Sequence, residues 1–152
     1  MTAEERLAEL GLTVPEVVPP VAAYLPAVRS GAMVYTAGQI PMRDGVLVAT
    51  GKVGDGVTPE VAYECARQCA LNAMAAIRSV TGTLEGIRIL KVGVFVASAP
   101  DFTAQAAVAN GASELFGAVF GELGVHARSA VGVAVLPLDS AVEVEVIAEV
   151  VG

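Results

Sequence analysis

The sequence carries little charge, and most of that charge is negative. Charged residues make up 16% of the chain, whereas about 25% is usual in soluble proteins. Nine lysine and arginine residues stand against sixteen aspartate and glutamate residues, which leaves a formal net charge of −7. A surface of this sign repels a phosphate backbone. We therefore expect no nucleic acid among the partners of this protein.

Cysteine and histidine are also scarce. Two cysteines and one histidine are too few for a disulfide framework, so a reducing compartment is expected. Cys65 and Cys69 lie four residues apart in an apolar helical stripe, which favours core packing over metal binding. The glycine motifs of nucleotide-binding proteins are absent, as are HExxH, CxxC and GxSxG. The sequence therefore predicts neither a metal nor a cofactor.

Long hydrophobic runs are missing, although 55% of the residues are hydrophobic. Glycine, proline or charge interrupts every run before about 18 apolar residues accumulate, so no membrane span is expected. The acidic first residues do not resemble a secretory signal, and we expect a soluble protein of the cytoplasm. Because 16% charge is little to cover a monomer, apolar patches should remain for association, which predicts a homo-oligomer.

The length of 152 residues fits one domain. Within the single domain 1–152, residues 1–23 are expected to form an N-terminal helix and a proline-rich arm, and residues 24–152 the core. Thr58 and Pro59 are suited to begin a helix as N-cap and first helical residue. The elements predicted for the first half are a helix over 2–10, an extended arm over 12–26, strands over 32–39 and 46–48, a turn at 43–45 and a helix over 59–81.

In the second half the apolar pattern predicts one helix and three strands. The helix is expected to begin with Asp101 as its cap and to end before Gly124. The strands are expected over 87–97, 129–136 and 141–150, the last two as a hairpin. The order β-β-β-α-β-α-β-β indicates an α+β fold with two helices on one face of a sheet. Since strand 87–97 is apolar on both faces, a second subunit is expected to cover the other face.

Two charged residues near the C-terminus are candidates for a site. Arg128 begins one predicted strand, and Glu143 lies on the polar face of the next. Surface charge is the ordinary explanation for each residue, since ion pairs at strand ends are common and weak. The predicted hairpin, however, would bring the guanidinium and the carboxylate to one end of one sheet. His126, in the preceding loop, is interpreted as a solvated residue rather than a catalytic one.

Several motifs resemble the RidA (YjgF) reactive-intermediate deaminase family, from about Tyr24 to the C-terminus. They are Ala37-Gly38-Gln39-Ile40-Pro41, Arg128-Ser129-Ala130-Val131, Leu136-Pro137 and Val142-Glu143-Val144-Glu145-Val146-Ile147-Ala148. The resemblance implies a chorismate-mutase-like fold and a homotrimer with three clefts between subunits. The activity that it implies is hydrolysis of 2-imino or 2-enamino acids to 2-keto acids and ammonia without a cofactor. Residues 1–20 resemble a longer branch of the family with an extra N-terminal segment.

The resemblance also implies roles for particular residues. Arg128 would hold the substrate carboxylate and Glu143 would position a water, while Tyr24 would act as an aromatic gate, Gly38 as a backbone contact and Asn110 as a polar residue of the cleft. The chain departs from the family at two positions. Ala130 stands where many members carry cysteine, and Gly132 where glutamate is frequent. These departures leave the substrate preference open.

Three functions are therefore weighed. The leading one is an imine deaminase that clears reactive intermediates of amino-acid metabolism. The second is a trimeric binder that holds small carboxylate metabolites without turning them over. Glu143 favours the enzyme, since a pure binder needs no group for proton transfer. An endoribonuclease ranks third, because a chain of net charge −7 lacks the basic surface that RNA requires.

Overall fold

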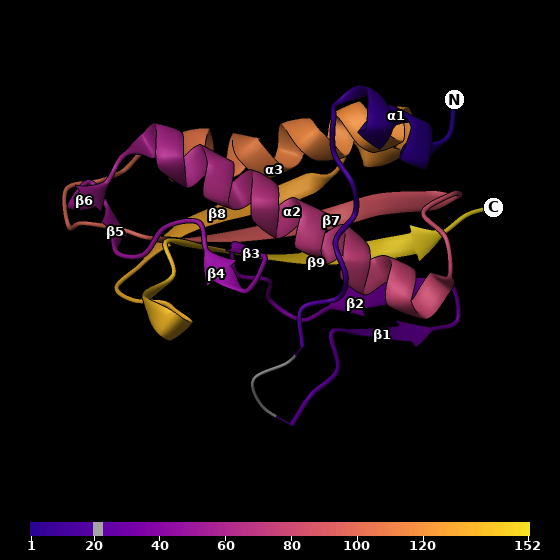
Figure 1. The fold of residues 1–152 in the computed structure, drawn as a ribbon, viewed down its shortest axis with the longest axis horizontal. Helices are drawn as coiled ribbons and strands as arrows, with labels where there is room; N and C mark the ends of the chain where they lie inside the picture. Colours follow the sequence, from indigo (N-terminus) through magenta and orange to yellow (C-terminus); the bar gives the residue numbers. More distant parts are fainter. Residues whose placement is uncertain (20–22) are drawn as a thin grey trace.

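A five-stranded sheet with two long helices on one face forms the body of the molecule (Figure 1). The computed structural model describes residues 1–19 and 23–152, so positions 20–22 of the predicted arm lie outside the described residues. The sheet has the order β1-β2-β9-β7-β8, with the bounds Ala27–Ser30, Met33–Thr36, Val142–Val150, Ile87–Ala97 and Ala127–Val133. The helices are α1 (Ala3–Glu9), α2 (Pro59–Thr81) and α3 (Gln105–Phe120). The α+β fold and the short N-terminal helix are confirmed.

Four short strands and two short 3-10 helices complete the described chain. Strands β3 (Met42–Arg43) and β4 (Val46–Leu47) pair as an antiparallel ribbon outside the main sheet, and β5 (Lys52–Val53) pairs in parallel with β6 (Gly56–Val57). The 3-10 helices are η1 (Gly121–Gly124) and η2 (Pro137–Asp139). The turn of the first ribbon, Asp44-Gly45, has positive φ at both residues, as expected for a tight hairpin.

The first predicted strand, 32–39, is wrong in its bounds. The structure has a hairpin of β1 and β2 there, with Gly31 in the turn at a φ of 59°. The sequence did not reveal β1, because three of its four residues are exposed and show no apolar alternation. Beyond β2, Gln39 pairs separately with Val144.

Helix α2 forms where the local signals place it. The Thr58 side chain accepts a hydrogen bond from the Val61 amide (3.2 Å), and Pro59 opens the helix. Gly82 ends the helix in the left-handed conformation at a φ of 77°. Cys65 and Cys69 are both fully buried on its inner face, as predicted. Burial raises the pKa of the Cys65 thiol to about 11.

The predicted start of α3 at Asp101 is wrong. The helix begins at Gln105, and its N-cap is Ala104, which makes no side-chain capping bond. The Phe102 amide instead bonds to the Ala99 carbonyl (3.0 Å), which closes a turn after β7. The chain must reverse here before it can run back across the sheet, so the helix starts one turn later than the capping signal suggests.

The predicted hairpin of the last two strands is also wrong. Strand β7 lies between β8 and β9, parallel to the first and antiparallel to the second. Helix α3 connects β7 to β8 as a crossover, which sets β8 parallel to β7 at the edge of the sheet. The cleanly alternating β9 fits the more enclosed place between β7 and β2. A local turn signal could not distinguish this arrangement from a hairpin.

The two faces of the sheet differ in what covers them. Val92, Val94 and Val96 of β7 are buried on the face beneath the helices. On the opposite face lie Tyr35 and Val131, which remain 46% and 44% exposed. Within the described chain the helices pack on the first face only (Figure 1). A second subunit on the opposite face stays a prediction.

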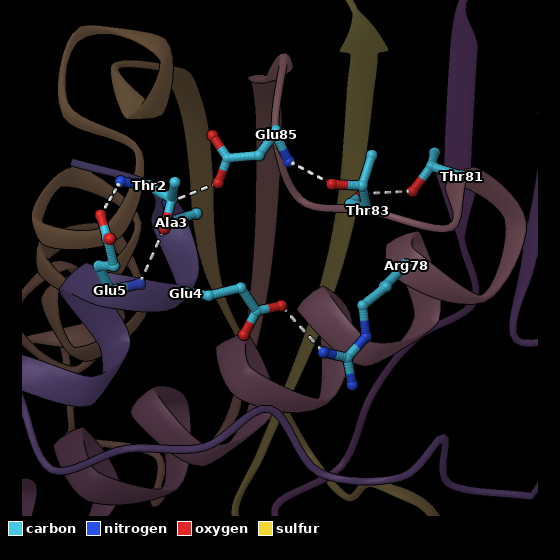
Figure 2. Close-up of polar contacts among 8 residues, drawn as sticks. All are labelled: Thr2, Ala3, Glu4, Glu5, Arg78, Thr81, Thr83 and Glu85. Atoms are coloured by element: carbon cyan, nitrogen blue, oxygen red, sulfur yellow. Dashed lines mark hydrogen bonds and ion pairs between the residues drawn. The ribbon is translucent and has the colours of Figure 1, made fainter.

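Helix α1 is fastened to the body by polar contacts at its beginning (Figure 2). Thr2 and Glu5 form a reciprocal capping box. The Ala3 amide donates to Oε1 of Glu85 (2.7 Å), and Arg78 of α2 forms an ion pair with Glu4 (3.0 Å). The exposed ion pair adds little stability. Leu7, which is 1% exposed, supplies the apolar contact.

We expect Leu7→Ala to lower the free energy of unfolding by about 2–5 kcal/mol, because it leaves a cavity beneath α1. The matched control is Leu10→Ala at the end of the same helix, where the side chain is 42% exposed. The control should stay within about 0.5 kcal/mol of wild type. Urea unfolding followed by circular dichroism measures both variants, and equal losses would show that α1 does not dock as described.

Candidate functional site

A pocket beside the end of the N-terminal arm brings together three of the residues singled out in the sequence. Tyr24, Gly38 and Glu143 all line it. Its other walls are mostly apolar and come from the arm, the segment after β2 and the loop that carries η2, namely Val18, Pro19, Pro26, Gln39, Ile40, Pro137 and Leu138. The pocket therefore sets a carboxyl group within largely apolar surroundings.

The backbone at Gly38 touches the Glu143 carboxyl group. Gln39 and Val144 exchange two backbone hydrogen bonds (2.8 and 2.9 Å), which hold the two segments side by side. A Cβ atom on Gly38 would lie 2.7 Å from Oε1 of Glu143. Only glycine leaves room for the Glu143 carboxylate here. The backbone of Gly38 therefore packs directly against this carboxylate.

The electrostatic surroundings of Glu143 favour its protonated form. Desolvation by burial raises the pKa of this carboxyl group above its usual value, and the negative charge of Glu145 raises it further. A carboxyl group with a raised pKa is better suited to exchange protons near neutral pH. Within the chain, Arg128 is not among the groups that shift the pKa of Glu143.

Arg128 lies in a different place, against one face of α3. Its Nη1 donates to Oδ1 of Asn110 (2.8 Å) and to Oγ of Ser113 (3.1 Å), and Nη2 lies 3.4 Å from the Ala106 carbonyl. These three contacts use three of the five donors of a guanidinium. The Nε–H and one N–H of Nη2 have no acceptor within the described chain, and together they can bind a carboxylate.

The structure thus places Arg128 and Glu143 on opposite faces of the sheet. Arg128 pairs with Val92 of β7, and Glu143 pairs with Phe95. Side chains alternate between faces along a strand, so positions three apart point to opposite sides. The expectation that a hairpin gathers both groups at one end of the sheet is wrong, because β7 separates their strands. One chain therefore holds two separate groups of candidate residues: Glu143 with Tyr24 and Gly38, and Arg128 with Asn110.

The two departures from the family pattern lie on the Arg128 side. Ala130 and Gly132 follow Arg128 at every second position of β8 and pair with Val94 and Val96. A Cβ on Gly132 would lie 2.7 Å from Nε2 of Gln105 and 3.1 Å from Oγ of Ser98. The Gln105 side chain therefore occupies the space that a larger residue at position 132 would need.

The interpretation of His126 as a solvated loop residue is wrong. Its ring is half-buried and bonded at both nitrogens, to Ser113 (2.8 Å) and to the Gly124 carbonyl (2.6 Å), and it packs edge-on against Phe116. Ser113 was not singled out at all. Its position, three residues after Asn110, would place both side chains on one helical face, and this spacing was the available signal.

Two features are absent from the described part of the chain: a cluster of metal-binding side chains and a helix that could span a membrane. Residues 1–19 and 23–152 contain no group of three or more histidine, cysteine, aspartate or glutamate side chains arranged to hold a metal ion. Among the same residues, no helix has the length and apolar character needed to cross a membrane.

The chain is similar to proteins of one family. It matches the family model described as Endoribonuclease L-PSP over residues 15–150. Protein TCP17 of Trypanosoma cruzi is 42% identical over 145 residues, which cover 94% of this chain and 91% of TCP17. Atu1372, a protein with unknown function from Agrobacterium tumefaciens, has a structure that matches this one with a TM-score of 0.90 and 42% sequence identity. The match covers 98% of this chain and 92% of the Atu1372 chain. The structure of the E. coli YjgF gene product matches with a TM-score of 0.61 and 31% sequence identity. This match covers 88% of this chain and 93% of the YjgF chain.

Proposed function

This chain belongs to the endoribonuclease L-PSP family, the family of YjgF and the Rid proteins, and from this premise we propose that it hydrolyses 2-imino and 2-enamino acids. The products are 2-keto acids and ammonia. The observation that carries the proposal is the half-buried Glu143 carboxyl group with its raised pKa, held in a mostly apolar pocket against Gly38. A protein that only binds carboxylates has no use for such a group.

The proposed reaction needs two groups from the protein. The two available N–H groups of Arg128 hold the substrate carboxylate and fix the plane of the imine. The ionised Glu143 holds a water molecule and accepts its proton while the water oxygen forms a bond to the imine carbon. Glu143 then returns this proton to the nitrogen of the tetrahedral intermediate and accepts the proton of the new hydroxyl group as the carbon–nitrogen bond breaks. The carbonyl of the 2-keto acid forms, and the released ammonia takes up the last proton from Glu143. Tyr24 lines the pocket wall and is 44% exposed, which suits the proposed role of an aromatic gate.

Because the two groups lie on opposite faces of one sheet, the proposed site needs two protomers. One protomer supplies Arg128 and Asn110, and its neighbour supplies Glu143, Gly38 and Tyr24. The exposed apolar side chains on the open sheet face, among them Tyr35 and Val131, give the protomers a surface on which to associate. The family resemblance indicates that three copies close the ring.

We expect light scattering at micromolar concentration to give three times the chain mass of 15.4 kDa. A monomer would contradict both the trimer and the shared cleft, because an isolated chain does not bring Arg128 to Glu143. Measurement across a tenfold dilution series checks that the assembly persists at the concentrations used for kinetics.

The proposed activity is tested with imines generated in situ by an amino-acid oxidase. Since imines also hydrolyse spontaneously, ammonia release is followed with and without the protein, and the protein should accelerate it. If the protein binds 2-keto acids but leaves the rate unchanged, it is a binder of small carboxylates. The name of the family model raises RNA cleavage as another function. The net charge of −7 disfavours it, and incubation with a labelled single-stranded RNA tests it directly.

A further inference from the structure

A chain of hydrogen bonds runs from the loop before β8 to the Arg128 guanidinium. His126 Nδ1 lies 2.6 Å from the Gly124 carbonyl, and Nε2 lies 2.8 Å from Oγ of Ser113. Ser113 Oγ in turn accepts a hydrogen bond from Nη1 of Arg128 (3.1 Å). Four groups from η1, the loop, α3 and β8 are thereby connected.

The direction of each bond follows from what the groups can donate. A carbonyl oxygen only accepts, so Nδ1 of His126 carries a hydrogen and donates it to Gly124. In the tautomer with hydrogen on Nδ1 alone, Nε2 is an acceptor, and the Ser113 hydroxyl group donates to it. Because the Ser113 hydroxyl hydrogen is donated to His126, the Ser113 oxygen accepts the hydrogen bond from Nη1 of Arg128.

The position of His126 is itself determined by packing. Phe116 of α3 meets the ring edge-on, with the ring centroids 5.9 Å apart. A Cβ on Gly124 would lie 2.2 Å from the Phe116 carbonyl oxygen, so only glycine lets η1 approach α3 this closely. This approach sets the Gly124 carbonyl where His126 can reach it. The ring is thus held from two sides independently of Arg128.

We infer that His126 and Ser113 are positioning residues for the Arg128 clamp. Ser113 and Asn110 occupy both hydrogens of Nη1, so the guanidinium cannot rotate to present that end to a ligand. The edge formed by Nε–H and Nη2–H is the one left for a carboxylate. The expected effect on kinetics rests on the proposed function. The conformational order of the Arg128 side chain, in contrast, can be measured without any ligand.

The test compares Ser113→Ala and His126→Leu with wild type, with Ser113→Thr as the conservative variant that keeps the hydroxyl group. The matched control is Ser79→Ala on α2, which removes a hydroxyl group whose one partner in the described part of the chain is the Ala76 carbonyl of the same helix. Relaxation of the Arg128 Nε–H signal in NMR spectra reports side-chain order, and circular dichroism verifies the fold. We expect the Nε–H to be rigid in wild type, Ser113→Thr and Ser79→Ala, and mobile in Ser113→Ala and His126→Leu.

Binding and kinetics give the second readout. We expect Ser113→Ala and His126→Leu to weaken binding of 2-oxobutanoate about tenfold by calorimetry, and to raise KM by a similar factor while kcat changes little. Unchanged Arg128 order in both variants would overturn the inference even if the deaminase activity is real. A wild-type protein that neither binds 2-oxobutanoate nor accelerates imine hydrolysis would overturn the proposed function, while the NMR comparison would still decide the role of His126 and Ser113.

Discussion

Arg128→Ala should lower kcat/KM for imine hydrolysis by about 30- to 5,000-fold, which corresponds to about 2–5 kcal/mol for a truncated charge pair. The alanine leaves the substrate carboxylate without its two-pronged partner in a partly desolvated cleft. It also removes the alignment of the imine carbon with the water. Steady-state kinetics with oxidase-generated imines measure the effect.

The Lys variant at the same position separates charge from geometry. Arg128→Lys keeps a positive charge but has no planar fork, so it should also lose activity steeply, though less than the alanine variant. Arg29→Ala is the matched control, because Arg29 lies exposed on β1 and, among the described residues, bonds only to the nearby Gly31 carbonyl. Near-full hydrolysis by Arg128→Ala in an intact trimer would mean that the carboxylate clamp lies elsewhere.

Glu143→Gln should abolish turnover while leaving the binding of 2-keto acids intact or stronger. The amide is close in size to the carboxyl group and keeps the contact with Gly38, but it cannot accept a proton from water. A negative charge near the bound carboxylate is also removed. Calorimetry with 2-oxobutanoate and the ammonia assay measure the two effects separately, and substantial turnover by this variant would remove Glu143 from the mechanism.

The neighbouring Glu145 supplies the control and a pH dependence of defined sign. Glu145→Gln removes the same charge two residues away at an exposed position, so turnover at the optimal pH should persist. The proposed base must be ionised, so activity rises with pH through the pKa of Glu143, which burial and Glu145 raise. Removing the Glu145 charge lowers that pKa, and the acidic limb of the pH–rate profile should move to lower pH.

Mixing the two inactive variants tests whether a cleft draws its groups from two protomers. If Arg128→Ala and Glu143→Gln chains are unfolded and refolded together, about a quarter of the clefts should combine an intact arginine with an intact glutamate. Activity should then return. If both groups came from one chain, no cleft in the mixture would contain the pair, and the mixture would stay inactive.

Helix α2 and strand β9 were predictable because their signals are local. The capping residues Thr58 and Pro59 and the terminal Gly82 act within one helical turn of the backbone they influence. The alternation of β9 likewise shows which of its side chains are buried. The motifs around Gly38 and Arg128 were enough to indicate the family that the chain comparisons confirm.

The relative position of Arg128 and Glu143 could not be predicted from local sequence signals. The residues themselves could be picked out by their types and motifs, but the side of the sheet to which each points depends on strand order and register. Strand β7 takes the place between β8 and β9 because the crossover through α3 sets β8 at the edge, whereas β9 is buried between β7 and β2. The link from His126 through Ser113 to Arg128 depends in the same way on the packing of η1 against α3. The sequence by itself determined which residues are candidates for the proposed chemistry, and only the long-range packing decided that one chain holds Arg128 and Glu143 on opposite faces of the sheet.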